Sequence, residues 1–173
     1  MLKLREPNIN DKEKILDMIN EIKNYDGNFE GLSIFSNIED YNLWLKKIED
    51  NKYQERINEE YSPQTTYLLV DEEDNIIGGA NIRHVLKGEL INYGGNVGYL
   101  IRPSQRKKKY GNLLLSLALT ECKKRGLSKV LIGCRKENIA SSKVIEHNGG
   151  IYENDYYDQN NKNTYKRYWI NIN

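Results

Sequence analysis

Four cationic residues in a row, followed at once by small and polar residues, carry the clearest chemical potential in this 173-residue sequence. They follow a short apolar stretch, 97–101, and precede a segment, 113–125, whose apolar residues recur at helical spacing. The N-terminus of a helix presents free backbone amides and the positive end of the helix dipole, and both attract anions. We therefore expect a phosphate-bearing ligand at Arg106, Lys107, Lys108, Lys109, Tyr110, Gly111 and Asn112.

Three interpretations of this basic loop compete. Many charge runs of this kind are simply solvated, and a second interpretation is a patch that binds nucleic acid. The strand before the loop and the helix after it favour a phosphate site, because they direct the loop amides towards one point. The glycine patterns of nucleotide hydrolases (Gly-x-x-x-x-Gly-Lys-Ser/Thr) and of dinucleotide-dependent dehydrogenases (Gly-x-Gly-x-x-Gly) are absent from the sequence, which disfavours both classes.

The elements that position this loop are predicted from apolar spacing and from helix and turn signals. Pro103 ends the strand before the loop, and Gly126 stands where a helix C-terminal glycine belongs. Asn10 and Glu13 suggest a capping box for an early helix, and Asn138 is a good N-cap for a late one. The predicted strands are 2–5, 66–70, 76–83, 97–101, 129–134, 151–153 and 165–172, and the predicted helices are 10–25, 37–48, 113–125 and 138–148.

This order of elements predicts an α/β domain with a mixed sheet. The strands at 97–101 and 129–134 are joined through a helix, so we expect a right-handed parallel crossover between them. One domain over residues 1–173 is the expected count for a chain of this length.

Residues 102–111 resemble the acyl-CoA pyrophosphate loop of the GCN5-related N-acetyltransferases, the GNAT family. The family pattern is Gln/Arg-x-x-Gly-x-Gly/Ala. Arg106 matches its first position and Gly111 its last, whereas Lys109 stands where the middle glycine is usual. A positive φ at that position would make a lysine there costly.

A second segment, 134–150, resembles the family's strand-to-helix segment with its Asn-x-x-Ala/Ser motif. Asn138 and Ser141 match the asparagine and the small residue, and the resemblance places both in the cofactor site. A helix cap with no ligand contact is the alternative role for Asn138. Many family members carry a tyrosine acid seven residues after the asparagine, and this sequence departs from them with Ile145.

The resemblance implies a GNAT-like acyl-CoA N-acyltransferase fold. Its central sheet is mostly antiparallel, flanked by helices, and splayed after the fourth strand, 97–101. The pantetheine arm of acetyl-CoA (coenzyme A) then lies in the cleft. In the family the equivalent strand pairs with this arm and one of its amides polarises the acyl carbonyl, which assigns Leu100 and Ile101 to the cofactor site.

Acetyl transfer from a thioester to an amine further requires a base for the ammonium proton and an acid for the leaving thiolate. Glu89 is one candidate base, and Asn96 acting through a bound water is another; the connector 51–63 supplies further glutamates. Ser142 is a candidate to replace the missing tyrosine acid. Cys134, a tyrosine from elsewhere or water remain as alternatives.

The composition narrows the remaining classes. The net charge is +1, so the basic loop is a local feature and broad nucleic-acid binding is disfavoured. Two cysteines without a pairing pattern, and the lack of a signal peptide, favour reduced thiols and a cytoplasmic location. No apolar run approaches the roughly 20 residues of a membrane span, and no zinc-ligand spacing occurs.

The sequence therefore favours an N-acetyltransferase that moves the acetyl group of acetyl-CoA to a primary amine of a small molecule or peptide, by direct attack in a ternary complex. Its acceptor is unidentified, although Glu55, Glu59, Glu60 and Glu89 would suit a cationic amine. The alternatives are a non-catalytic acyl-CoA-binding module and an RNA-binding protein. We expect a monomer or homodimer with no metal and no nucleic-acid or membrane partner.

Overall fold

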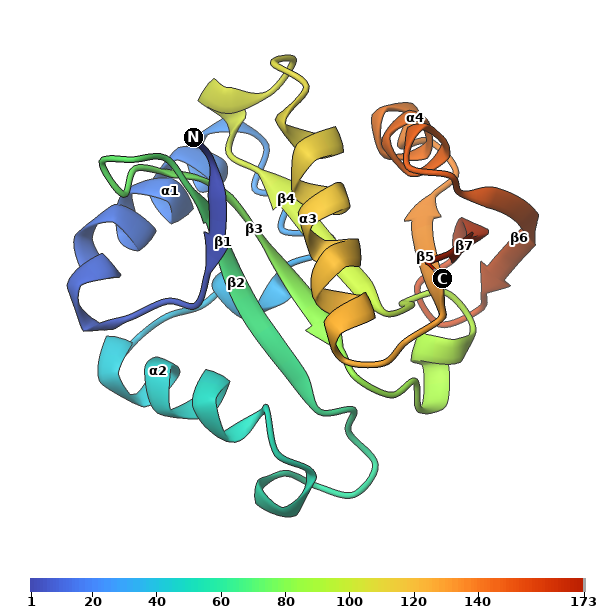
Figure 1. The fold of residues 1–173 in the computed structure, drawn as a ribbon, viewed down its shortest axis with the longest axis horizontal. Coiled ribbons are helices and arrows are strands. Elements are labelled where there is room, and N and C mark those ends of the chain that lie inside the picture. The colour runs from blue at the N-terminus through green and yellow to red at the C-terminus, as the bar shows by residue number, and fades with distance from the viewer. Residues whose placement is uncertain (173) are drawn as a thin grey trace.

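The computed structural model describes residues 1–172 and shows two antiparallel sheets with helices packed on them (Figure 1). The first sheet has the order β1-β2-β3-β4, with β1 Lys3–Arg5, β2 Gln64–Val70, β3 Ile76–Arg83 and β4 Val97–Ile101. The second has the order β5-β7-β6, with β5 Lys129–Arg135, β6 Ile151–Asp158 and β7 Asn163–Asn171. The helices are α1 Lys12–Tyr25, α2 Tyr41–Asp50, α3 Tyr110–Lys124 and α4 Ile139–His147.

The first sheet is covered on both faces, which explains why β2 is buried along nearly its whole length. Leu68 and Val70 point into an apolar cluster with α1 and α2, whereas Tyr67 and Leu69 point into a second cluster with α3. The second cluster continues into β5, β7 and α4. Figure 1 shows α3 lying over the first sheet, beside the unit formed by α4 and β5–β7. α3 therefore packs against both sheets.

The two sheets part between β4 and β5. The Asn96 amide donates to Leu131 O at 2.7 Å, and the Leu131 amide donates to Asn96 Oδ1 at 2.9 Å, but no ladder joins the two strands within residues 1–172. Gly95 makes this contact sterically possible, because its φ is +67° and a Cβ there would lie 2.3 Å from Leu131 O. The predicted splay after the fourth strand is confirmed. The predicted α/β fold class is confirmed as well, but every ladder in this part of the chain is antiparallel, so the parallel pairing expected between β4 and β5 does not form a ladder.

The start of the first helix also differs from the prediction. Asn8 and Asp11 form the capping box, on a single 3-10 turn (Ile9–Asp11) that precedes α1. Asp11 is 3% exposed and accepts two hydrogen bonds of 2.7 Å from Arg5, so its position is set by β1 as well as by the local sequence. Within the described residues, no helix combines the length and the apolar character that crossing a bilayer requires.

Candidate acetyl-CoA and acceptor site

The turn that leads into α3 leaves backbone amides unused. Lys107 and Lys109 adopt left-handed φ values of 63° and 62°, a conformation that costs about 1–2 kcal/mol for a residue with a Cβ. The Asn112 amide donates to Lys109 O at 3.1 Å, and no side chain caps the helix. Among residues 1–172 no acceptor is found for five consecutive amides, those of Lys107, Lys108, Lys109, Tyr110 and Gly111. Such a run of free amides at a helix N-terminus is suited to bind a phosphate group.

Arg106 does not share in this exposed turn. Its Nε donates to Ile101 O at 3.0 Å, and its guanidinium donates to Asp26 Oδ2 at 2.9 Å and lies 5.2 Å from the ring centre of Tyr25. The side chain thus fastens the loop to the end of α1 instead of facing the free amides. The three lysines at 107–109 are exposed and remain as the cations available to a ligand.

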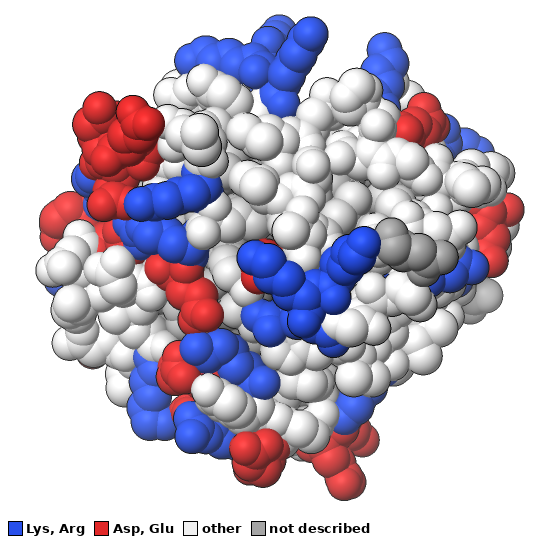
Figure 2. Space-filling model, viewed as in Figure 1, with Lys and Arg blue, Asp and Glu red and all other residues white. Residues whose placement is uncertain are grey.

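A second arginine holds the start of the same loop. Arg102 donates to Asp17 at 2.7 Å and to Glu21 at 2.5 Å, and Glu21 also accepts the Ser104 amide at 2.6 Å. In Figure 2 basic side chains project from the edge where this loop lies in Figure 1, and a second group of basic side chains lies near the centre of the same face. Elsewhere on this face acidic side chains accompany the basic ones, in keeping with a net charge of only +1.

One edge of β4 is open, because β4 pairs only with β3 in this part of the chain. The Arg83 amide donates to Asn96 O at 2.7 Å, and hydrogen bonds to the same neighbour recur at every second residue of an antiparallel strand. Leu100 therefore directs its backbone groups to β3, while Tyr99 and Ile101 direct theirs to the open edge. Of the two residues predicted to contact the pantetheine, Ile101 has the suitable backbone orientation.

The first turn of α4 lies beside this end of β4. Asn138 Oδ1 accepts the Ser141 amide at 3.0 Å, which confirms the predicted N-cap. The Ser141 hydroxyl lies 3.0 Å from the Tyr99 hydroxyl, so α4 and β4 meet here. A Cβ on Gly111 would lie 3.3 Å from Val144, which shows how closely α3 approaches α4. The structure thus brings together the cofactor candidates of β4, the basic loop and α4.

The predicted catalytic residues are not brought together. Asn96 is 4% exposed, and its amide group is engaged with the Leu131 amide and, at 3.3 Å, with Arg83 O. Ser142 is also 4% exposed and lies 3.4 Å from Cys134 Sγ beneath α4. Glu89 is exposed on a 3-10 turn of the β3–β4 connection and borders a separate cavity.

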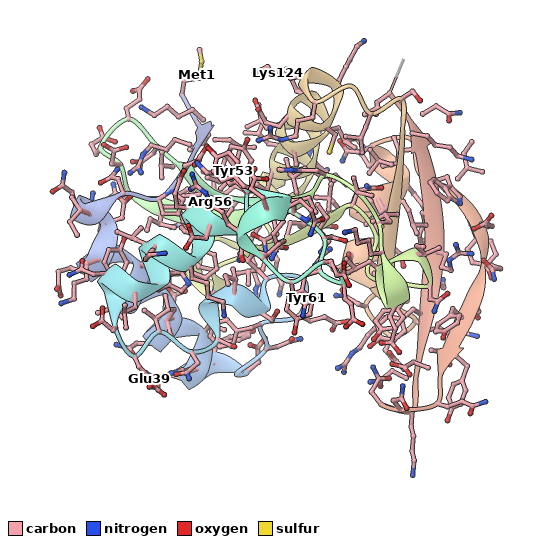
Figure 3. All side chains as sticks on the ribbon, turned by 90° about the horizontal axis from the view of Figure 1, so that it is seen from below. Met1, Glu39, Tyr53, Arg56, Tyr61 and Lys124 are labelled. Carbon is pink, nitrogen blue, oxygen red and sulfur yellow. The ribbon has the colours of Figure 1, made fainter. Side chains whose placement is uncertain are left out.

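That cavity has a volume of about 880 Å³ and lies where three connections meet the ends of β2 and β3. Its walls come from the α1–α2, α2–β2 and β3–β4 connections, so residues distant in sequence line one space; Tyr61, labelled in Figure 3, belongs to the α2–β2 wall. The lining residues are Ser33, Ile34, Lys47, Glu60, Tyr61, Ser62, Gln64, Asn81, Arg83, Lys87, Gly88, Glu89, Leu90, Tyr93 and Gly94.

Two residues that the sequence did not single out lie at the splay. The Tyr99 side chain faces α3 and α4, and its burial raises the pKa of its phenol. Glu30, on the α1–α2 connection, pairs with Arg135 at the end of β5 at 3.2 Å, and burial raises the pKa of its carboxyl. The next residue, Gly31, packs on β4, since a Cβ on Gly98 would lie 1.9 Å from Gly31 O. No local sequence pattern predicts a role for Glu30, because its position depends on the α1–α2 connection packing on β4 and reaching the end of β5.

Comparisons with known proteins agree with this geometry. The model of the acetyltransferase (GNAT) domain family matches residues 2–151. None of the curated proteins compared with the chain matches its sequence. Within residues 1–172 no group of three or more His, Cys, Asp or Glu side chains is placed to hold a metal ion.

Several solved structures share the fold. The ribosomal L7/L12 alpha-N-protein acetyltransferase RimL, in complex with coenzyme A, is 18% identical with a TM-score of 0.71, covering 99% of this chain and 94% of its own. An N-acetyltransferase from Staphylococcus aureus Mu50 is 14% identical with a TM-score of 0.67, covering 100% and 99%. The spermidine N-acetyltransferase from Vibrio cholerae is 16% identical with a TM-score of 0.66, covering 99% and 94%. Because the GNAT family model matches most of this chain, residues 2–151, the chain belongs to the GNAT acetyltransferases and is an acetyl-CoA-dependent N-acetyltransferase.

Proposed function

We propose that this protein transfers the acetyl group of acetyl-CoA directly to a primary amine of a small molecule or peptide, with both substrates bound together. The observation that carries the proposal is the run of five free amides at the start of α3, next to the open edge of β4. One end of the cofactor is a diphosphate and the other a thioester on an extended arm. The diphosphate suits the free amides of the α3 turn, and the extended arm with its thioester suits the unpaired edge of β4.

The residues that hold the cofactor follow from this placement. The amides from Lys107 to Gly111 hold the diphosphate, and the three lysines neutralise it and the ribose phosphate. The Ile101 amide is free to pair with the pantetheine arm, whereas the Ile101 carbonyl accepts the hydrogen bond from Arg106. Asn138 uses its side-chain oxygen for the helix cap, which leaves its NH₂ group as a donor to the arm. Ser141 lies beside it.

Bound acetyl-CoA supplies the electrophilic thioester, and the chain has to move two protons. We propose Tyr99 as the acid that protonates the leaving thiolate, in place of the tyrosine replaced by Ile145, which is fully buried. Its phenol is protonated at neutral pH and lies 3.0 Å from the Ser141 hydroxyl, beside the proposed path of the pantetheine arm. We propose Glu30 as the base. Its carboxylate lies where β4 and β5 separate, next to Arg135, and its raised pKa favours proton uptake.

The cofactor assignment is tested by thermal-shift titration with acetyl-CoA, coenzyme A, ATP and NAD. Stabilisation by acetyl-CoA and coenzyme A is expected, and stabilisation by ATP or NAD alone would contradict it. Release of coenzyme A thiol in the presence of an amine panel then tests turnover. Binding without release on any amine would favour the non-catalytic module.

The proton-transfer assignment is tested with Glu30→Gln and Tyr99→Phe. Each is expected to lower kcat/KM by about 100-fold or more, while the affinity for coenzyme A stays within about twofold. Wild-type kcat/KM should fall as the pH drops through the raised pKa of Glu30, because the base must be ionised. Glu13→Gln is the matched control, since Glu13 is exposed on the first turn of α1 and has no role in the proposed site. Unchanged kinetics in Glu30→Gln would remove that residue from the mechanism.

A further inference from the structure

The cavity of about 880 Å³ contains a guanidinium group that has no acidic partner. The Arg83 side chain donates to Gly94 O and Gly95 O, both at 3.0 Å, and both bonds use the same nitrogen. No ion pair of Arg83 occurs among residues 1–172, although Glu60 and Glu89 line the same space. Burial lowers the pKa of Arg83 to about 10, so the group stays charged at neutral pH without any nearby anion. The remaining guanidinium donors are available to a ligand.

The neighbours of Arg83 point to the same kind of ligand. Lys87 Nζ donates to two neutral oxygens, Gln54 Oε1 at 2.5 Å and Glu59 O at 2.6 Å, and so adds a second cation without a carboxylate. The Ser62 hydroxyl is buried with no hydrogen-bond partner in the part of the chain that the structure describes. Ser62 is only 8% exposed, so its unused hydroxyl lies at a protected wall of the cavity.

Arg83 is also placed close to the reaction centre. Its backbone pairs with Asn96, the residue at which β4 and β5 make contact before they separate. The Arg83 side chain lies on the face of β3 opposite to Ile82, which belongs to the cluster with α3. The cavity therefore lies on the face of the first sheet opposite to α3. An acceptor in the cavity and a cofactor bound at α3 would meet in the gap between β4 and β5.

We infer that the amine acceptor of this enzyme carries an anionic group, a carboxylate or a phosphate, which the Arg83 guanidinium binds while the amine reaches the splay between β4 and β5. This inference rests on the proposed function and narrows it. A guanidinium binds carboxylates and phosphates strongly, because it can donate two parallel hydrogen bonds to two oxygens of the same group. The carboxylates of Glu60 and Glu89 lie in the same cavity and suit the ammonium end of such a zwitterion. A purely cationic polyamine would leave Arg83 unpaired and oppose its charge.

The inference is tested with matched pairs of acceptors. Each amino acid is compared with its amide, phosphoethanolamine is compared with ethanolamine, and spermidine is included as a polycation. We expect at least one anionic member to have a kcat/KM about 10- to 100-fold above that of its neutral partner. The amino-acid and phosphoethanolamine arms distinguish a carboxylate from a phosphate. Preference for spermidine or for the neutral amines would overturn the inference and leave the acetyltransferase assignment intact.

Variants of Arg83 connect this preference to the residue. Arg83→Gln should reduce the ratio to below about threefold, mainly through KM, and Arg83→Lys should retain part of it. Arg56→Gln is the matched control, because Arg56, labelled in Figure 3, lies on the α2–β2 connection outside the cavity lining. Stabilisation by coenzyme A must be unchanged in all three variants, which shows that they fold. A preference that survives Arg83→Gln would overturn the inference.

Calorimetric titration of the same compounds into the protein with coenzyme A bound gives a readout that does not require turnover. Binding of an anionic compound that is lost in Arg83→Gln would support the inference even if no thiol were released, and the proposed function alone would then fail. Absence of binding and of turnover for every anionic compound would overturn it.

Discussion

The first turns of α3 and α4 differ in how their free backbone amides are satisfied, although the two helices pack closely at Gly111 and Val144. At α4 the Asn138 side chain accepts the Ser141 amide, so the helix supplies its own cap. At α3 the residue before the helix is Lys109, with a left-handed φ of 62° and no cap, and the amides before and within the first turn stay free. A free helix end that is not satisfied locally has to be satisfied by solvent or by a ligand.

Under the proposed function, this contrast separates a helix start with a structural role from one that binds the cofactor. The α4 cap stabilises the helix whether or not a cofactor is present. The α3 turn holds two lysines in an unfavourable backbone conformation, which is a cost to folding that is offset when an anion binds. The loop is held in place by Arg102 and Arg106, which pair with α1 and its end.

The strongest test of the contrast is charge reversal at the α3 turn. Replacing Lys107, Lys108 and Lys109 together with Glu should raise the Kd for coenzyme A by about 100-fold or more, because three charge-assisted contacts become repulsive. Isothermal calorimetry measures the effect. Reversal of Lys123 and Lys124, at the other end of α3, is the matched control and should change the Kd by less than about twofold. An unchanged Kd in the triple variant would refute the assignment of this turn to the phosphates.

Asn138 tests whether the α4 cap also contacts the cofactor. Asn138→Asp keeps a capping oxygen and removes the NH₂ donor, so the KM for acetyl-CoA should rise about fivefold with little change in stability. Asn138→Ala should in addition lower the free energy of unfolding by about 1 kcal/mol. Chemical denaturation and steady-state kinetics measure the two effects. An unaltered KM in both variants would leave Asn138 with the cap alone.

The backbone at Lys109 gives a test of the stored strain. Lys109→Gly and Lys109→Ala both remove the charge, but only glycine is free of the left-handed penalty. The glycine variant should therefore be more stable than the alanine variant by about 1 kcal/mol in denaturant unfolding, with equal affinity for coenzyme A. Equal stabilities would show that this turn carries no strain.

The smallest expected effect concerns the pair that anchors the loop. Burial alone would raise the pKa of Asp26, but the hydrogen bonds from Arg106 and the Asn28 backbone outweigh it, so the pKa is lowered. A lowered folded-state pKa adds stability above the unfolded value, about 3.9, and this stability is lost as the pH falls through the folded value. Asp26→Asn should cost about 0.5 kcal/mol at neutral pH, because the pair is about one-third exposed. The difference from wild type should vanish once the pH has fallen below the lowered folded-state pKa of Asp26, and a difference that persists in stronger acid would have another cause.

Local features were predicted well where neighbouring residues decide them. Gly126 ends α3 with a φ of +83° and Gly149 ends α4 with a φ of +87°, both close to the predicted positions. The strand at 97–101 has the predicted bounds, and the exposed amides follow it as expected. The capping box lies two residues before the predicted one, because Asp11 is held by hydrogen bonds from Arg5 of β1.

Predictions that needed contacts between distant segments were less successful. Glu89 and Ser142 suit proton transfer by residue type, but Glu89 lines a separate cavity and Ser142 lies on the buried face of α4, next to Cys134. Arg106 matched the family motif, yet its guanidinium pairs with Asp26, a residue that no spacing rule connects to the loop. Glu30 became a candidate only because a connection folds across the splay.

By itself the sequence determined the family, the order of the elements and the basic turn with its free amides, because these depend on residues adjacent in the chain and on backbone preferences that act over one or two turns. The tertiary structure alone decided the acceptor side. Arg83 and Ser62 lie on separate segments and line one cavity, whereas Glu30, on a third segment, pairs with Arg135 at the end of β5. Whether a charged side chain is buried, and whether it has an acidic partner, depends on this packing. No local pattern in the sequence shows that Arg106 pairs with an aspartate while Arg83 has no acidic partner among residues 1–172.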